Sequence, residues 1–214
     1  MYGLIHKAAR SAVINISDKN SWDDILSDAG QSEVVLSADY YDDEVTMRLV
    51  DAVATKFGKS RDEVLKIVGE HWVEFTVSEG YNSIFTHAGD TLEKFLINLD
   101  RMHNSLTVTL PNAVMPSFQL IKSTNEGFEL IYRSQRTGFA TFVEGILMGL
   151  CEYYNTPMHI IFEDDKDGIR FSLKHRQSLT SISENSTDGK YKLSGDFVLK
   201  GSILNPPMTM SKTA

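Results

Sequence analysis

The spacing of apolar residues changes near residue 110, and this change constrains the fold more than any other feature of the chain. Before it, apolar residues recur every three or four positions, as on one face of an α-helix. After it, β-branched and aromatic residues alternate with polar ones, as in strands with one buried face. Pro111 and Pro116 lie between the two regions, where each removes a backbone donor and favours extended geometry. The sequence therefore predicts an α+β protein with its helices first.

Amphipathic helices are predicted along the first region. One runs from Ser21 to Gly30, a second from Asp43 to Gly58, and a third begins where Ser60 and Glu63 have capping-box spacing. A further helix spans residues 91–107. Its apolar face contains Leu92, Phe95, Leu96, Leu99, Met102 and Leu106, and His103 lies on that face.

The second region is predicted to contain two hairpins separated by a helix. The expected elements are strands at 117–122 and 128–136, a helix at 138–154, and strands at 158–163 and 169–174. Turn-forming residues at 125–127 and an Asp-Gly pair at 167–168 join the strands. From residue 177 to residue 214, Ser, Thr, Asn and Gly predominate, which indicates a tail or linker with room for one added strand.

The charge and cysteine content disfavour several classes of protein. The chain has 29 Asp and Glu against 21 Lys and Arg, and its net charge of −8 repels nucleic acid. Cys151 is the single cysteine, which excludes an internal disulfide and fits a reducing cytoplasm. The first residues lack a secretory-signal pattern, and no apolar run approaches the roughly 20 residues that cross a bilayer. We therefore expect a cytoplasmic protein with no nucleic-acid or membrane partner.

His103 is a candidate metal ligand. An imidazole on the apolar face of a helix is withdrawn from water, so it needs a hydrogen-bond partner or a metal to offset its desolvation. A core histidine with a protein partner is the more common case, and the spacing alone favours it. A heme changes this balance, because the porphyrin supplies four nitrogens and the protein need supply only one axial imidazole.

Tyr132, Ser134 and Arg136 form a second candidate site. Residues two apart on a strand share a face, so these three would present two hydroxyls and a guanidinium in one row. Such a row can bind carboxylates through charge-assisted hydrogen bonds. The alternative, which the motif alone favours, is a solvated polar strand face.

Together these residues resemble the H-NOX (heme nitric oxide/oxygen-binding) family, which is related to the heme domain of soluble guanylate cyclase. Its hallmark is a proximal histidine followed about thirty residues later by Tyr-x-Ser-x-Arg, as in His103 and residues 132–136. Shorter segments at 1–5, 42–45, 79–81, 89–92 and 98–100 are similar to those of cyanobacterial and other bacterial members. The resemblance covers about residues 1–176.

The resemblance implies a heme b (iron protoporphyrin IX) between a helical distal lobe, about residues 1–65, and a proximal α/β lobe, about residues 66–176. His103 would be the proximal iron ligand. Tyr132, Ser134 and Arg136 would bind the heme propionates. Ile5 and Pro116 match positions that press on the porphyrin, although ordinary packing is the alternative for both.

The distal side of the heme decides which gas binds. Relatives that hold oxygen place a tyrosine hydroxyl there, because bound oxygen acquires negative charge that a donor stabilises. The matching position here is Phe142, with Ile146 one helical turn further on. Trp72 matches a second distal position, but its place in an apolar stripe favours packing. The resemblance therefore implies binding of nitric oxide and carbon monoxide in an apolar pocket, without a stable oxygen complex.

The family also implies a sensor that is not itself an enzyme. Nitric oxide would weaken the iron–histidine bond, and the signal would pass to a separate histidine kinase or cyclic-dinucleotide enzyme. Two alternatives stay open: a heme enzyme of peroxidase type, which needs a distal acid or base, and a heme-free structural adaptor. The remaining histidines are expected to be surface or packing residues: His6, His71, His87, His159 and His175.

Overall fold

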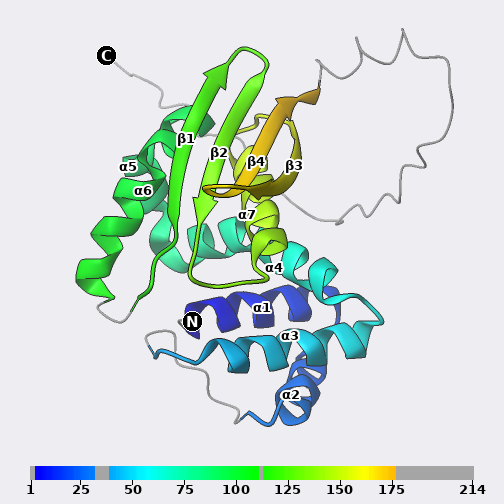
Figure 1. Cartoon of the computed structure of the whole chain (residues 1–214). Helices are drawn as coiled ribbons and strands as arrows, with labels where there is room; N and C mark the ends of the chain where they lie inside the picture. Colours follow the sequence, from blue (N-terminus) through cyan, green and yellow to red (C-terminus); the bar gives the residue numbers. More distant parts are fainter. Residues whose placement is uncertain (1–2, 32–38, 111–112, 177–214) are drawn as a thin grey trace, which may run out of the picture.

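The computed structural model describes residues 3–31, 39–110 and 113–176 (Figure 1). Its helices are α1 (Gly3–Ile16), α2 (Lys19–Asp28), α3 (Asp43–Phe57), α4 (Arg61–Thr76), a π-helical turn η1 (Val77–Tyr81), α5 (Asn82–Ala88), α6 (Leu92–Thr109) and α7 (Ala140–Tyr153). Its strands are β1 (Ser117–Thr124), β2 (Gly127–Arg133), β3 (Met158–Asp165) and β4 (Gly168–His175). The predicted α+β class is confirmed. The strand considered in the tail lies outside the described residues.

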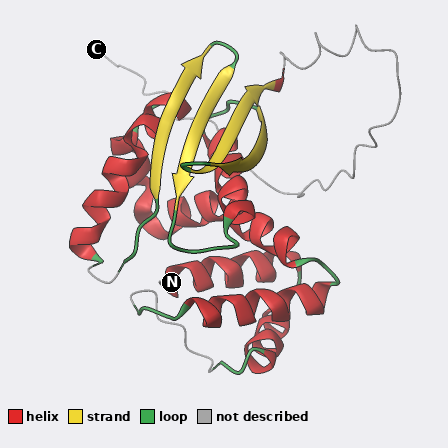
Figure 2. Cartoon of the chain, viewed as in Figure 1, coloured by secondary structure: helices red, strands yellow, loops and turns green. Residues whose placement is uncertain are grey.

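Helices α1, α2 and α3 pack together with the first half of α4, away from the sheet (Figure 2). Local signals begin and end these helices: Asp18 accepts a hydrogen bond from the backbone N–H of Ser21, and Gly58 ends α3 with a left-handed φ of 61°. Ser60 and Glu63 form the predicted capping box at the start of α4. The apolar faces of these four helices share one buried cluster, which includes Trp22, Ile25, Leu49, Val53, Val64, Val68, Phe139 and Phe142.

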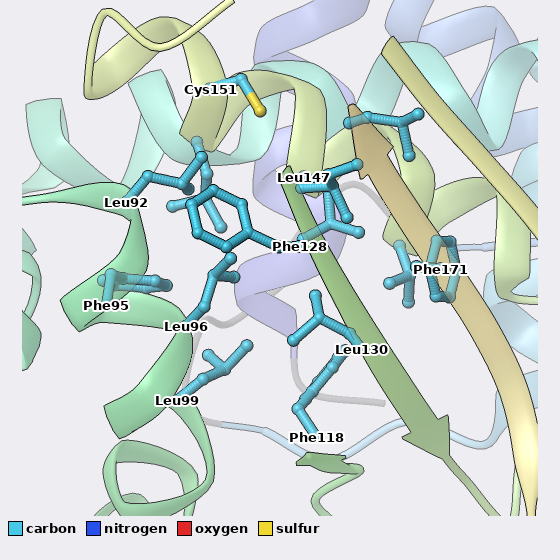
Figure 3. Close-up of a cluster of buried hydrophobic side chains, with 14 of the residues drawn as sticks. Leu92, Phe95, Leu96, Leu99, Phe118, Phe128, Leu130, Leu147, Cys151 and Phe171 are labelled. Atoms are coloured by element: carbon cyan, nitrogen blue, oxygen red, sulfur yellow. The ribbon is translucent and has the colours of Figure 1, made fainter. Parts of the chain in front are cut away.

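The strands form one antiparallel sheet in the order β1-β2-β4-β3. Helices α6 and α7 cover one face of it (Figure 1). Their leucines interlock with aromatic and aliphatic residues of the sheet, as Figure 3 shows for Leu96, Leu99, Leu147, Phe128, Leu130 and Phe171. This second buried cluster fixes α6, and with it His103, against the sheet.

The second strand is shorter than predicted. We expected a strand at 128–136, but β2 ends at Arg133, where its pairing with Ser117 of β1 also ends. The Ser134 hydroxyl then accepts a hydrogen bond from the backbone N–H of Arg136 at 3.0 Å, which forms a local turn in place of a strand ladder. The prediction that Tyr132, Ser134 and Arg136 share one strand face is therefore wrong.

Glycines allow the backbones of α4 and α7 to touch where the helices cross. A methyl group added at Gly69 would lie 2.2 Å from the carbonyl oxygen of Phe142, and one at Gly145 would lie 2.1 Å from that of Lys66. Gly149 makes a third close approach. Only glycine fits at such distances, so this crossing fixes α7 and Phe142 against the helical cluster.

In the part of the chain that the structure describes, none of the helices combines the length and the hydropathy that crossing a membrane requires.

Candidate functional site

His103 lies on α6 with its ring 5.5 Å from that of Phe118 on β1. Its Nδ1 atom is buried and makes no hydrogen bond to any described residue. A second contact ties the two elements together: the backbone N–H of Phe118 donates to the Asp100 carboxylate at 2.8 Å. The helix is thus anchored to the sheet one turn before the imidazole, and the buried Nδ1 atom of the imidazole has no hydrogen-bond partner among the described residues.

Burial lowers the pKa of His103, and the Asp100 carboxylate and the Pro116 backbone only partly oppose this effect. The imidazole is therefore neutral at neutral pH, which is the form that binds iron. Among the described residues no group of three or more His, Cys, Asp or Glu side chains could hold a metal ion. A metal at His103 would need its other ligands from a cofactor, so the donor set fits a heme and not a bare ion.

Tyr132, Ser134 and Arg136 are brought together by the turn after β2. A side-chain hydrogen bond joins Tyr132 and Ser134, and burial raises the pKa of the Tyr132 phenol despite that bond and the nearby Arg136 charge. The Tyr132 ring packs 5.1 Å from Phe118, which also contacts His103. The imidazole and the Tyr-x-Ser-x-Arg motif therefore flank a shared aromatic ring, although the motif is not a row on one strand face.

Arg136 also connects the two parts of the fold. Its Nε donates to the Asp43 carboxylate on α3 at 3.0 Å, and its Nη1 donates to the carbonyl oxygen of Val114 at 2.6 Å. Partial burial would raise the pKa of Asp43, but the hydrogen bond and charge of Arg136 hold it below its usual value. The guanidinium is thus held in place near the sheet, where it could also donate a hydrogen bond to a second anionic group. Asp43 was not among the predicted site residues.

The loop before β1 lies between these groups. Val114 accepts the hydrogen bond from Arg136, and Pro116 is half-buried with its backbone beside His103. The sequence predicted Pro116 as a contact of the cofactor, and the structure brings it next to the proposed ligand.

The predicted distal residues divide into two groups. Ile5 and Phe142 line a small cavity of about 20 Å³ inside the helical cluster, and Ile146 packs where the two buried clusters meet. Trp72 instead packs against the α/β cluster, with its indole 6.3 Å from the ring of Phe75. This arrangement supports the packing role for Trp72 over a role at the distal face.

His6, which the sequence predicted to be a surface or packing residue, is a buried packing residue beside the predicted distal residues. It lines the same cavity as Ile5 and Phe142 and is 2% exposed. Its Nε2 lies 2.9 Å from the Thr46 hydroxyl, while its Nδ1 is buried and makes no hydrogen bond to a described residue. Burial lowers its pKa to about 4. Its neighbour Thr46 is 40 positions away, so local spacing carries no sign of the pair.

The buried state of His6 predicts a specific dependence of stability on pH. In the unfolded chain its pKa returns to 6.5, so between pH 6.5 and about 4 only the unfolded state is protonated. The free energy of unfolding should therefore decrease as the pH falls from 6.5 to about 4. At the lower end of this pH window His6 should account for a loss of about 3 kcal/mol. Urea unfolding of the wild type and of His6→Leu at several pH values measures this effect. The free energy of unfolding should depend on pH more steeply in the wild type than in His6→Leu below pH 6.5, and equally in both above about pH 7. Equal slopes of this free energy against pH at low pH would contradict a lowered pKa of His6.

Solved structures with the same fold define the class of the protein. The chain superimposes on an H-NOX protein from S. oneidensis in its Fe(II)NO state with a TM-score of 0.73, at 17% identity over 82% of this chain and 99% of that one. It superimposes on an unliganded Fe(II) H-NOX protein from K. algicida with a TM-score of 0.69, at 21% identity over 82% of this chain and 97% of that one. The fold is therefore that of the H-NOX proteins.

The Haem-NO-binding family model matches residues 2–161, and the chain belongs to this family. Curated relatives include soluble guanylate cyclases of Caenorhabditis elegans. The chain is 24% identical to gcy-31 over 94% of its own length, and 29% identical to gcy-35 over 69%. It spans only 29% and 22% of those two proteins. The match thus concerns only part of each of these two cyclases.

Proposed function

We propose that this chain is a gas sensor that binds nitric oxide and carbon monoxide at a ferrous heme b, with His103 as the proximal ligand. The half-buried His103, whose buried Nδ1 makes no hydrogen bond to a described residue, carries this proposal. The family match supports heme as the group that it serves. When bound, the heme would supply a ferrous iron that can accept a diatomic gas, and His103 would be the residue that holds this iron.

The polar residues of the site would orient the cofactor. Tyr132, Ser134 and Arg136 supply hydroxyl and guanidinium donors suited to propionate carboxylates, and Arg136 is already held by Asp43 and Val114. Apolar contacts would exclude water from the porphyrin. We propose that these contacts come from Ile5, Pro116, Phe142 and Ile146, and that Trp72 is a packing residue of the α/β cluster.

Helix α6 is the element that would transmit the signal. His103 is on α6, and α6 is anchored to the sheet by the Asp100–Phe118 hydrogen bond and by its buried leucines. A release of His103 on gas binding would allow α6 to shift relative to the helical lobe. The lobe boundaries that we propose remain about residues 1–65 and 66–176.

The output of such a sensor needs another polypeptide or domain. We propose a histidine kinase or a cyclic-dinucleotide enzyme of a bacterial cell as the partner, and not a catalytic role for this chain. The single cysteine supports a cytoplasmic location. Size-exclusion chromatography of the chain with each candidate enzyme, followed by an activity assay of that enzyme with and without nitric oxide, tests the pairing.

Two observations weigh against a peroxidase. That chemistry uses a distal histidine together with an arginine, and no arginine is among the described residues that line the cavity beside Phe142. The arginine of the Tyr-x-Ser-x-Arg motif, Arg136, is engaged by Asp43. A peroxidase assay of the heme-loaded protein should show no turnover above that of free heme.

The proposed function is tested by the absorption spectrum of protein expressed with an adequate heme supply. We expect a Soret band of a five-coordinate ferrous histidine complex that nitric oxide converts into a nitrosyl spectrum. Absence of a Soret band would favour a heme-free adaptor. A ferrous spectrum that does not respond to nitric oxide would exclude the sensor.

Arg136 should control how long the heme stays bound. We expect Arg136→Met to release heme about tenfold faster or more, because it removes the charge-assisted hydrogen bonds of the guanidinium, including the one to Asp43. Transfer of heme to an excess of a heme-scavenging apoprotein measures this rate. Arg133→Met is the matched control, because Arg133 hydrogen-bonds to Gln119 on the neighbouring strand. Equal release rates for both variants would rule out a propionate role for Arg136.

A further inference from the structure

The sheet has two edge strands, β1 and β3, which differ in how they are protected from other strands (Figure 1). β1 has a bulge between Leu120 and Lys122, and α6 packs beside it. Bulges and lysines keep an edge strand from pairing with another chain. β3 has neither, and it pairs with β4 without interruption from Met158 to Asp165. Among the described residues no strand pairs with the other edge of β3, so a further strand could add there.

Two adjacent apolar side chains are exposed in the middle of β3. Ile161 is 51% exposed and Phe162 is 37% exposed. Ile161 lies beside Ser172 of β4 on the outer face of the sheet. Phe162 lies on the other face, where its ring is 5.3 Å from that of the buried Phe171. An added strand would cover both side chains, because it would extend both faces of the sheet at once.

We propose that β3 pairs with β3 of a second copy of this chain, antiparallel and about a two-fold axis that passes through Ile161 perpendicular to the sheet. The two four-stranded sheets would then form one continuous sheet across the axis. Each residue of β3 would lie opposite the residue of the second copy that is equally far from Ile161 on the other side. The proposal goes beyond the proposed function and does not depend on heme or gas binding.

The sequence of β3 is complementary to itself in this register. On the outer face Ile161 would lie opposite Ile161 of the second copy, and His159 opposite Glu163, whose carboxylate can accept a hydrogen bond from an imidazole. On the other face Ile160 would lie opposite Phe162. A shift of the second copy by two residues in either direction would place Ile161 opposite His159 or Glu163 and lose these pairs. A shift by one residue would mismatch the two faces.

The acidic residues at the end of β3 do not oppose this pairing. Asp164 would lie opposite Met158, and Asp165 accepts two hydrogen bonds from the Arg170 guanidinium of its own chain, at 3.0 and 2.6 Å. In this register no acidic residue of β3 lies opposite another. The net charge of −8 repels two copies at long range, so association requires salt that screens this charge. A single strand pair is a small interface, and we therefore expect a dimer that forms only at high concentration.

Sedimentation equilibrium of the full chain, from about 10 µM to about 1 mM in about 0.15 M salt, tests the association. The average mass should rise from that of one chain toward that of two. Ile161→Lys should raise the dissociation constant about tenfold or more, because it places two positive charges opposite each other at the axis. Ile121→Lys is the matched control, since Ile121 is exposed on the other edge strand. A wild type that stays monomeric, or equal dissociation constants for the two variants, would overturn the proposal.

An exchange of residues tests the register. His159→Glu should weaken the dimer, because it places a carboxylate opposite Glu163 of the second copy. The double variant His159→Glu with Glu163→His should restore the dimer, because the same pair is then present with its members exchanged. A double variant as weak as His159→Glu alone would contradict the axis at Ile161.

A disulfide at the axis gives a readout that does not depend on affinity. Opposite residues of an antiparallel pair have Cα atoms about 4.5–5.5 Å apart, which a disulfide can span. Oxidation with copper–phenanthroline should therefore convert Ile161→Cys into a covalent dimer. The wild type, whose Cys151 is buried, and Ile121→Cys should remain single chains. Equal cross-linking of Ile121→Cys and Ile161→Cys would mean that random collision joins the chains, and would refute the contact at β3.

Hydrogen exchange distinguishes a second copy from any other occupant of this edge. The β3 amides that point away from β4 should exchange more slowly as the protein concentration rises. Protection that is the same at every concentration would assign the edge to another segment of the same chain and would overturn the proposal. A chain that forms the dimer but binds no heme would leave this inference standing while the proposed function fails.

Discussion

His103→Gly is expected to abolish the five-coordinate ferrous histidine spectrum. In the proposed site, removal of the imidazole would delete the one protein bond to iron, while the Tyr132, Ser134 and Arg136 donors would remain to hold the propionates. The variant should therefore still bind heme, more weakly, and added free imidazole should restore a spectrum close to that of the wild type. Absorption spectra of the ferrous protein with and without imidazole measure both effects.

Asn104→Gly is the matched control for His103→Gly. Asn104 is the next residue on α6 and is exposed, so the substitution has a similar cost in helix propensity without removing the half-buried imidazole. Its spectrum should equal that of the wild type. If His103→Gly also kept the wild-type spectrum, a different residue would have to be the ligand.

Gly145→Val should destabilise the fold by about 3 kcal/mol or more. The new side chain would meet the carbonyl oxygen of Lys66, which lies 2.1 Å from the position of a Cβ atom, so α4 and α7 would have to separate. Their separation would disturb both buried clusters, because α4 and α7 contribute to each. Urea unfolding followed by circular dichroism measures the change.

Glu152→Val controls for the β-branched side chain on the same helix. Glu152 is exposed on α7, so the substitution should change stability by no more than about 1 kcal/mol. Equal losses for the two variants would mean that the close crossing is not needed for folding.

Much of the fold was predictable because its elements have local signals. The capping box at Ser60, the apolar face of the 92–109 helix and the Asp-Gly turn of the second hairpin all depend on neighbours within a few residues. Helix α1 has no acidic residue in its first turn and no basic residue in its last, so its ends carry no charge signal. The π-helical turn contains Gly80 with φ of 92°, a geometry that periodicity does not indicate.

The site was predictable only in part. His103 and the Tyr-x-Ser-x-Arg motif could be found from their spacing, but the turn that joins Ser134 to Arg136 depends on where the pairing with β1 ends. The partner of Arg136 is Asp43, which is 93 positions away, and no local pattern links such a pair. The close approach of α4 and α7 is likewise a tertiary contact. In the sequence, a glycine inside a helix indicates only a lower helix propensity, and it does not indicate that a second helix crosses there.

The iron–imidazole stretching band in the resonance Raman spectrum of the ferrous protein tests the assignment of His103 most directly. We predict that the band is present in the wild type, shifts when histidine is labelled with ¹⁵N, and disappears in His103→Gly. It should also disappear when nitric oxide is added to the wild type. A band that persists unchanged in His103→Gly would contradict the account, because another side chain would then hold the iron.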